Sequence, residues 1–302
     1  MTYNLFNLTY YTARELQQVI EGTATGGSTT TIVDASGRLT QYGDDYFNLN
    51  DVGTAWLLRD SAGASAAPEG EYALVSDFVS STGTATVATF TIAVASGDSY
   101  GIANDKFPLT TIIQHINMAL MELPWITKTD TTSVRIAAAK TEYSLPTGLA
   151  GGQLREVWIQ GQTSDANDNR WQRVYNWYIQ RSDTGTADLL IMPYQYATDY
   201  YCKLVYMAPH ADLRVYTDKI DEDIPLSRIV YPSALSLAWW AKERFKTDEY
   251  DSMIVRLEAA TERAKNSYRI ESPQPQRKSR KILTEHSYLT MDESDPGTVY
   301  IR

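Results

Sequence analysis

The sequence predicts an α+β fold in which a helical bundle frame is interrupted by two antiparallel β modules, each a small barrel or sandwich, and is followed by an extended C-terminal arm. Three observations predict this class. Apolar residues recur at helical spacing near the start, in the middle and near the end of the chain. Between these segments, short runs of β-branched and aromatic residues alternate with Gly, Ser, Asp and Asn turns. The residues after 270 show no regular apolar pattern.

The first element is a helix that begins near Thr12. Thr12 and Glu15 have the spacing of a capping box, in which the hydroxyl and the carboxylate satisfy free backbone amides at a helix start. An apolar stripe follows, and Gly22 is expected to end the helix. Residues 1–22 are therefore assigned to the helical core domain.

The first β module is predicted to span residues 23–104. A Gly, Thr and Ser-rich stretch opens it, and such residues turn the chain and suit a pleated surface. The expected strands, separated by turn residues, are 55–59, 71–78, 84–92 and 100–103.

A second helix and a second β module follow. The helix begins at Pro108, whose fixed φ suits a first helical turn, and Pro124 ends it. Residues 105–128 thus return to the helical core domain, and residues 129–217 form the second β module. Its expected strands are 134–138, 142–145, 154–160, 171–178, 189–192 and 200–207.

Residues 218–270 complete the helical core domain as an antiparallel helical hairpin. Its first helix is apolar most of the way round, so it is expected to be central, and its second helix begins after the capping residue Thr247. The residues predicted to build this helical core are Leu235, Trp239, Trp240, Phe245, Ile254 and Leu257.

Residues 271–302 form the predicted extended arm, because Pro273 and Pro275 block a helix and the segment has no core of its own. The arm contains one concentrated basic run, which suits phosphate or an acidic protein surface. A solvated flexible tail is the plainer interpretation of this run. Docking on a protein is the function that we expect of its residues, Arg277, Lys278, Arg280 and Lys281.

Charge and composition exclude several classes of function. The 27 basic and 37 acidic residues give a net charge of −10, which disfavours sequence-specific nucleic-acid binding. No segment resembles a signal peptide or a membrane span, so a soluble, unexported protein is expected. The single cysteine, Cys202, excludes a disulfide framework within the chain and is expected to be a buried structural thiol. The excess of 21 Tyr and 7 Trp over 6 Phe suits extensive interfaces.

No catalytic or metal motif is recognisable, so the sequence predicts neither an enzyme nor a cofactor. His115, His210 and His286 are too dispersed to be placed in one cluster, and the HExxH, GxSxG and phosphate-loop patterns are missing. The run from Asp165 to Asn169 resembles the start of a calcium loop. It has Arg170 and Asn176 where such a loop needs Gly and Glu, so a polar hairpin tip is favoured.

Several stretches resemble the head-to-tail adaptor (neck or connector) proteins of tailed bacteriophages. They are GTATGGSTTTIVDASGRL from Gly22, DDYF from Asp44, SGDSYGI from Ser96 and the helical-hairpin sequence from Tyr231 to Lys265. Together with the elements around them, they cover about half of the chain.

The resemblance implies a structural virion protein that forms a dodecameric ring, a homo-oligomer that joins the capsid portal to the tail and forms part of the DNA channel. The implied partners are further copies of the chain, the portal, a tail or stopper protein, and double-stranded DNA that passes during ejection without sequence recognition. No membrane is involved. The implied location is the virion neck, at the head–tail junction, after assembly in the host cytoplasm. In such portal-binding adaptors a C-terminal segment contacts the portal, and no catalytic residues are carried over.

A carbohydrate- or receptor-binding tail module is the alternative. It is suggested by Trp158, Trp171, Trp177 and the tyrosines of the second β module, because aromatic faces stack on sugars. Exposed aromatic residues in a groove would favour this alternative, whereas aromatic residues buried between subunits would favour the connector.

Overall fold

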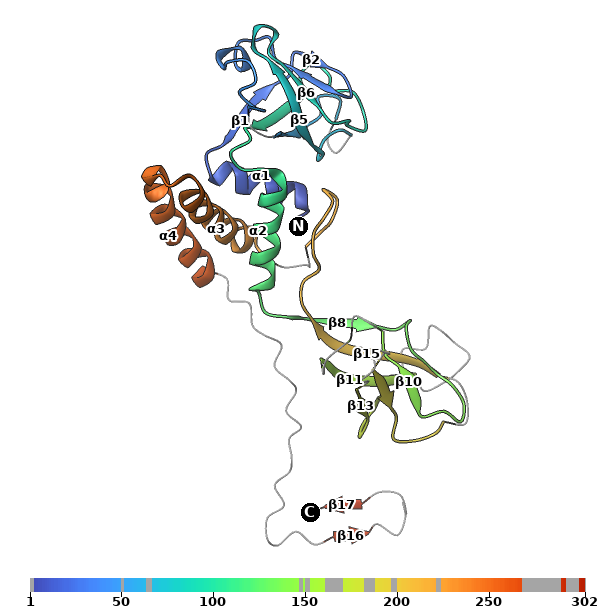
Figure 1. Ribbon diagram of the computed structural model, residues 1–302. Coiled ribbons are helices and arrows are strands. Elements are labelled where there is room, and N and C mark those ends of the chain that lie inside the picture. The colour runs from blue at the N-terminus through green and yellow to red at the C-terminus, as the bar shows by residue number, and fades with distance from the viewer. Residues whose placement is uncertain are drawn as a thin grey trace. The chain divides into compact units, whose positions relative to one another are not determined.

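The computed structural model describes residues 3–49, 52–63, 67–146, 149, 153–160, 171–181, 188–196, 200–220, 224–267, 289–291 and 299–301 (Figure 1). The chain divides into two compact units, Met1–Ser272 and Pro273–Arg302. Within the described ranges, none of the helices has the length and hydropathy needed to cross a bilayer.

The N-terminal helix begins earlier than the sequence pattern indicates. The described ranges contain the α-helices α1 (Leu5–Glu15), α2 (Leu109–Met121), α3 (Ser227–Phe245) and α4 (Asp251–Ser267). Asn4 caps α1, because its Oδ1 accepts the Asn7 backbone N–H at 3.1 Å. The prediction of a capping box at Thr12 is therefore wrong: Thr12 is buried within α1, and the chain leaves the helix after Glu15.

The first β module is a seven-stranded antiparallel sheet with the order β1-β7-β4-β5-β6-β3-β2. The segment from β1 into β2 pairs with β7 at one end and β3 at the other, which closes the sheet into a barrel. Its elements are β1 (Val19–Thr23), β2 (Gly26–Gly27), β3 (Thr31–Val33), the 3-10 helix η1 (Leu39–Gln41), β4 (Gly53–Arg59), β5 (Tyr72–Val79), the 3-10 helix η2 (Ser80–Thr82), β6 (Thr84–Val87) and β7 (Ser99–Ala103).

Gly22 lies inside β1 rather than at a helix end, so its predicted role as a helix stop is also wrong. A Cβ atom at this position would come within 2.4 Å of the Tyr100 hydroxyl. That hydroxyl donates a buried hydrogen bond to Asp34 Oδ2 at 2.6 Å. Glycine is therefore needed at position 22 because Tyr100 crosses the barrel interior to reach Asp34.

The helices do not form a bundle frame. The described residues contain about as much strand (31%) as helix (30%). The buried cluster that the four helices share also includes Trp56 of β4, Ala103 of β7 and Phe107. Trp56 is fully buried, and its Nε1–H donates to Thr9 Oγ1 of α1 at 3.1 Å. The α+β class is right, but the predicted helical bundle frame is wrong, because residues of the barrel complete the helical core.

The second β module has two antiparallel sheets that contribute to one buried cluster, which includes Tyr143, Val157, Leu190 and Leu204. One sheet has the order β12-β11-β15-β8, with β9 paired to β15, and the other has the order β10-β14-β13. The strands are β8 (Ile126–Asp130), β9 (Arg135–Ile136), β10 (Glu142–Ser144), β11 (Leu154–Gln160), β12 (Trp171–Val174), β13 (Tyr178–Gln180), β14 (Leu189–Ile191) and β15 (Tyr200–Ala208).

The C-terminal unit contains an antiparallel pair of strands, β16 (Leu289–Met291) and β17 (Val299–Ile301). The sequence pattern predicted only an extended arm here. The basic run at Arg277, Lys278, Arg280 and Lys281 lies outside the described residues, so its predicted role stays a prediction.

The predicted helical core residues divide into three groups. Ile254 and Leu257 are buried, and Leu235 and Trp240 are half-buried against the same cluster. Trp239 and Phe245 differ from the prediction, because they are 42% and 44% exposed. The residues that α3 buries include three alanines and Leu237, and such small side chains let the neighbouring helices approach closely. An apolar pattern around α3 therefore does not mean that every large side chain is buried.

Two tryptophan substitutions test this placement of the core. We expect Trp56→Ala to lower the free energy of unfolding by about 3 to 5 kcal/mol, because it leaves a large buried cavity. Trp239→Ala is expected to cost about 1 kcal/mol or less in the isolated chain. Urea unfolding of dilute protein, followed by circular dichroism, measures both. Equal losses for the two variants would contradict the assignment of Trp56 to the joint between barrel and helices.

Candidate interaction surfaces

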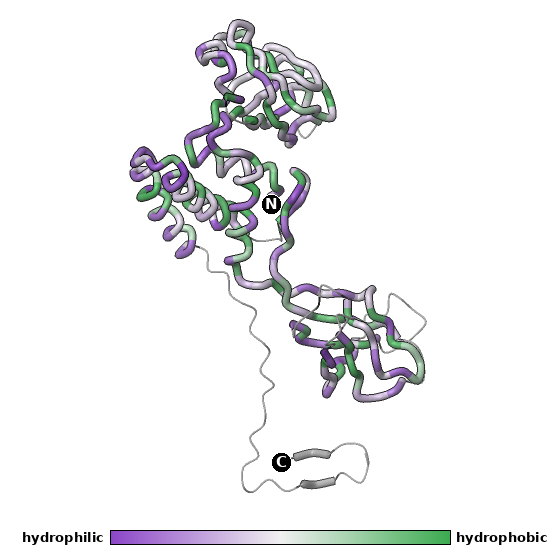
Figure 2. Tube along the Cα trace, in the orientation of Figure 1, coloured by the Kyte–Doolittle hydropathy of each residue, from purple (hydrophilic) through white to green (hydrophobic). Residues whose placement is uncertain are grey.

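The helices expose large apolar side chains although their shared core is already filled. Met118 and Met121 of α2 are exposed, as are Trp239 and Phe245 of α3 and Val255 of α4. Figure 2 shows apolar and polar residues mixed along these helices. Single exposed apolar residues are common on soluble proteins, and aromatic and Met side chains such as these are enriched at protein interfaces.

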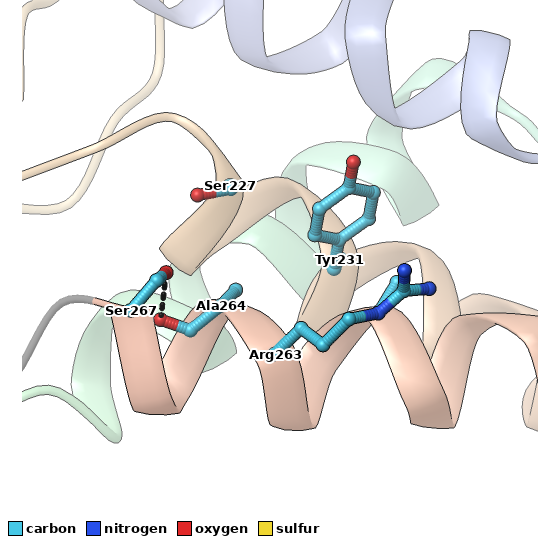
Figure 3. Close-up of a pocket in the computed structure, with 6 residues that line it drawn as sticks. Ser227, Tyr231, Arg263, Ala264 and Ser267 are labelled. Atoms are coloured by element: carbon cyan, nitrogen blue, oxygen red, sulfur yellow. Dashed lines mark hydrogen bonds between the residues drawn. The ribbon is translucent and has the colours of Figure 1, made fainter.

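A pocket lies between the start of α3 and the end of α4, and we call it the hairpin pocket (Figure 3). It has a volume of about 290 Å³ and is lined by Ser227, Tyr231, Ala260, Arg263, Ala264 and Ser267. The Ser267 hydroxyl donates to the Ala264 carbonyl at 3.2 Å, and Arg263 Nε donates to the Ala259 carbonyl at 3.1 Å. The lining combines small side chains, one aromatic ring and one cation. It suits a single flat apolar group with an anion beside it.

A second pocket, of about 540 Å³, lies between the turn after α1 and the start of α4, next to the 3-10 helix η4 (Asp248–Tyr250). Its charged groups are paired within the chain. Arg256 Nη1 lies 3.2 Å from Glu15 Oε2, and its Nη2 also donates to the Glu15 carbonyl. Glu249 lies 3.8 Å from Lys106 Nζ. This pocket is polar, but its ion pairs are already satisfied.

His115 and Ser236 form the arrangement that comes nearest to a base and nucleophile pair. His115 Nδ1 of α2 lies 2.8 Å from Ser236 Oγ of α3. Both residues lie inside helices, where the backbone amides are committed to helical hydrogen bonds and cannot stabilise an oxyanion. Desolvation lowers the pKa of His115. The pair is best explained as a hydrogen bond that fixes α2 against α3, and sequence spacing could not reveal it.

Metal-binding and thiol chemistry have little support in the part of the chain that is described. No group of three or more His, Cys, Asp or Glu side chains there is arranged to hold a metal ion. The possible calcium loop from Asp165 to Asn169 lies outside the described residues. The prediction that Cys202 is a buried thiol is confirmed, and burial, with a smaller contribution from Asp130, raises its pKa to about 12.

Cations and aromatic rings alternate across three strands of the second β module. Lys203 Nζ lies 4.7 Å from the Trp171 ring centre and 5.0 Å from that of Trp158. The Arg173 guanidinium lies 6.0 Å from the Trp158 ring and 5.6 Å from that of Tyr175. Glu156 accepts the Trp158 Nε1–H at 2.8 Å and pairs with Arg173 at 3.0 Å.

This arrangement bears on the carbohydrate alternative. The protein's own cations lie over Trp158 and Trp171, so these rings are not an open platform for a sugar. Trp177 is half-buried and packs against the core of the second module. Tyr175, Tyr178 and Tyr194 are exposed, and they do not line either of the two pockets described above. The geometry therefore does not favour sugar binding by the three tryptophans that suggested it.

Comparison with known proteins adds no identification. The chain matches no protein-family model, and no curated protein sequence matches it.

The pH dependence of stability tests the environment of His115. Because desolvation lowers the pKa of the folded histidine, the unfolded chain binds the proton more tightly. We expect stability to fall as the pH drops below about 6.5, the ordinary histidine value. His115→Gln should lose less stability than the wild type between pH 8 and pH 5, as measured by urea unfolding at both values. An unchanged loss in the variant would show that His115 is not desolvated.

Proposed function

We propose that this chain is a structural connector of a tailed bacteriophage, which forms a homo-oligomeric ring between the capsid portal and the tail. The observation that carries the proposal is the set of large apolar side chains that α2, α3 and α4 expose around a filled core. A ring subunit needs such lateral contact surfaces, and identical subunits that associate head to tail close into a ring when the rotation permits it.

The distribution of buried residues supports a subunit that folds before it assembles into a ring. The barrel, the helices and the second β module each have a buried cluster, and Trp56 of the barrel strand β4 belongs to the cluster of the helices. The outer faces of the helices are therefore not buried when the chain folds. They remain accessible for contacts with neighbouring subunits.

The charge of the chain fits a channel for DNA. With a net charge of −10, the chain is expected to bind DNA phosphates weakly. A strongly basic channel would instead bind the phosphates through counterion release and retain the DNA. Double-stranded DNA would thus pass without sequence recognition. The role requires no catalytic step, no cofactor and no membrane.

The remaining partners follow from the sequence resemblance. The arm from residue 271 is proposed to contact the portal, with its basic run at Arg277, Lys278, Arg280 and Lys281 pairing with acidic groups. A tail or stopper protein is proposed to bind at the opposite side. The location is the neck of the virion.

Deletion of residues 271–302 tests the portal contact. All but the first two of these residues belong to the second compact unit, Pro273–Arg302, so the melting temperature should change by no more than a few degrees. We expect portal binding, measured by co-sedimentation with purified portal rings, to be lost. The matched variant with alanine at the four basic positions should weaken binding, with the loss becoming smaller at high salt. A truncated chain that still binds portals, or a full chain that never does, would contradict the proposal.

A further inference from the structure

We infer that Trp239 and Glu243 of one copy of this chain dock into the hairpin pocket of a second copy. We call these two residues the α3 ridge. The inference rests on the proposed ring, and it specifies one lateral contact within it.

The α3 ridge has the properties of an interface anchor. Trp239 and Glu243 are four residues apart on a helix, so they lie on one face, and both are exposed. Lys242 Nζ lies 5.6 Å from the Trp239 ring centre and is itself paired with Asp251 of α4. These contacts hold the indole in a defined orientation, which reduces the entropy lost on binding. Tryptophan is among the residues that contribute most to binding energy at interfaces.

The hairpin pocket has the size and lining to receive one aromatic side chain. Its volume of about 290 Å³ is at or below the lower limit for small-molecule sites. Ala260 and Ala264 leave room beside the ring of Tyr231, as Figure 3 shows for Tyr231 and Ala264 on the two helices. The lining is therefore suited to an indole rather than to a larger ligand.

The charges of the α3 ridge and the hairpin pocket are complementary. Arg263 is exposed at the pocket, and among the described residues its side chain makes one hydrogen bond, from Nε to the Ala259 carbonyl. The terminal nitrogens of its guanidinium can bind the Glu243 carboxylate, and its plane can stack on the indole. Neither Glu243 nor Arg263 has an ion-pair partner within the described part of the chain. Pairing the two would break no existing ion pair.

The α3 ridge of one chain cannot reach the hairpin pocket of the same chain. Tyr231 of the pocket and Trp239 of the ridge lie eight residues apart on the same rigid helix, a separation of about 12 Å along its axis. Trp239 cannot bend back into the pocket beside Tyr231. Since every copy carries both the ridge and the pocket, a second copy of the chain is the occupant that the observations favour.

Charge reversal tests the contact. We expect Glu243→Arg and Arg263→Glu to lower the association constant of the full chain at least about tenfold each, measured by analytical ultracentrifugation. The double variant should return to within about threefold of the wild type, because the pair is restored with opposite sign. Trp239→Ala should also weaken association. Glu258→Arg, which changes an exposed carboxylate of α4 outside the pocket, is the matched control and should have no effect.

The possible results separate this inference from the proposed function. If the wild type forms rings and both single reversals leave them intact, the docking contact is wrong and the connector stands. Dimers that depend on the charge pair would support the contact and contradict the ring. A wild type that stays monomeric at all concentrations, with and without portal rings, would overturn both. Circular dichroism of each variant shows that the fold is retained.

Discussion

The contact between the barrel and the helices depends on the burial of Trp56. This residue belongs to β4, yet its indole lies in the helical core and donates to Thr9 of α1. Tyr10, the next residue of α1, packs edge-on against the same ring. A residue of the barrel strand β4 thus forms part of the buried core of the helices. Trp239 and Phe245 of α3 lie outside this buried cluster and remain exposed.

Regular patterns in the sequence were sufficient to predict the elements with a strong period. The helical hairpin, the helix after Pro108 and the strands at Leu154–Gln160 and Tyr200–Ala208 follow from apolar spacing and β-branched residues alone. The start of the first helix could not be predicted in this way. Thr12 and Glu15 match a capping box by chance, whereas Asn4 forms the cap. The joint at Trp56 was also beyond sequence reasoning. Its partner Thr9 lies 47 residues away, and no local pattern marks that contact.

The candidate surfaces show the same limit. A helix that is apolar most of the way round is expected to be buried, but this pattern does not predict which large residue faces outward. The pattern therefore predicts Trp239 in the core, whereas the residue is 42% exposed. The pairing of His115 with Ser236 spans 121 residues, and so only the fold brings the two together. The hairpin pocket is lined by residues of both α3 and α4, and the sequence does not show which residues of the two helices face each other. The surface most relevant to assembly therefore emerges only when α3 and α4 are packed.

The central claim is that the exposed faces of this chain exist to bind further copies of it. The most direct measurement is single-particle electron cryomicroscopy of the purified full chain, prepared together with portal rings. The account requires a closed ring of this polypeptide on the portal, in which the outer face of α3 is covered by the adjacent subunit. Particles of single chains whose α3 faces only solvent, beside portals that carry no additional density, would contradict it.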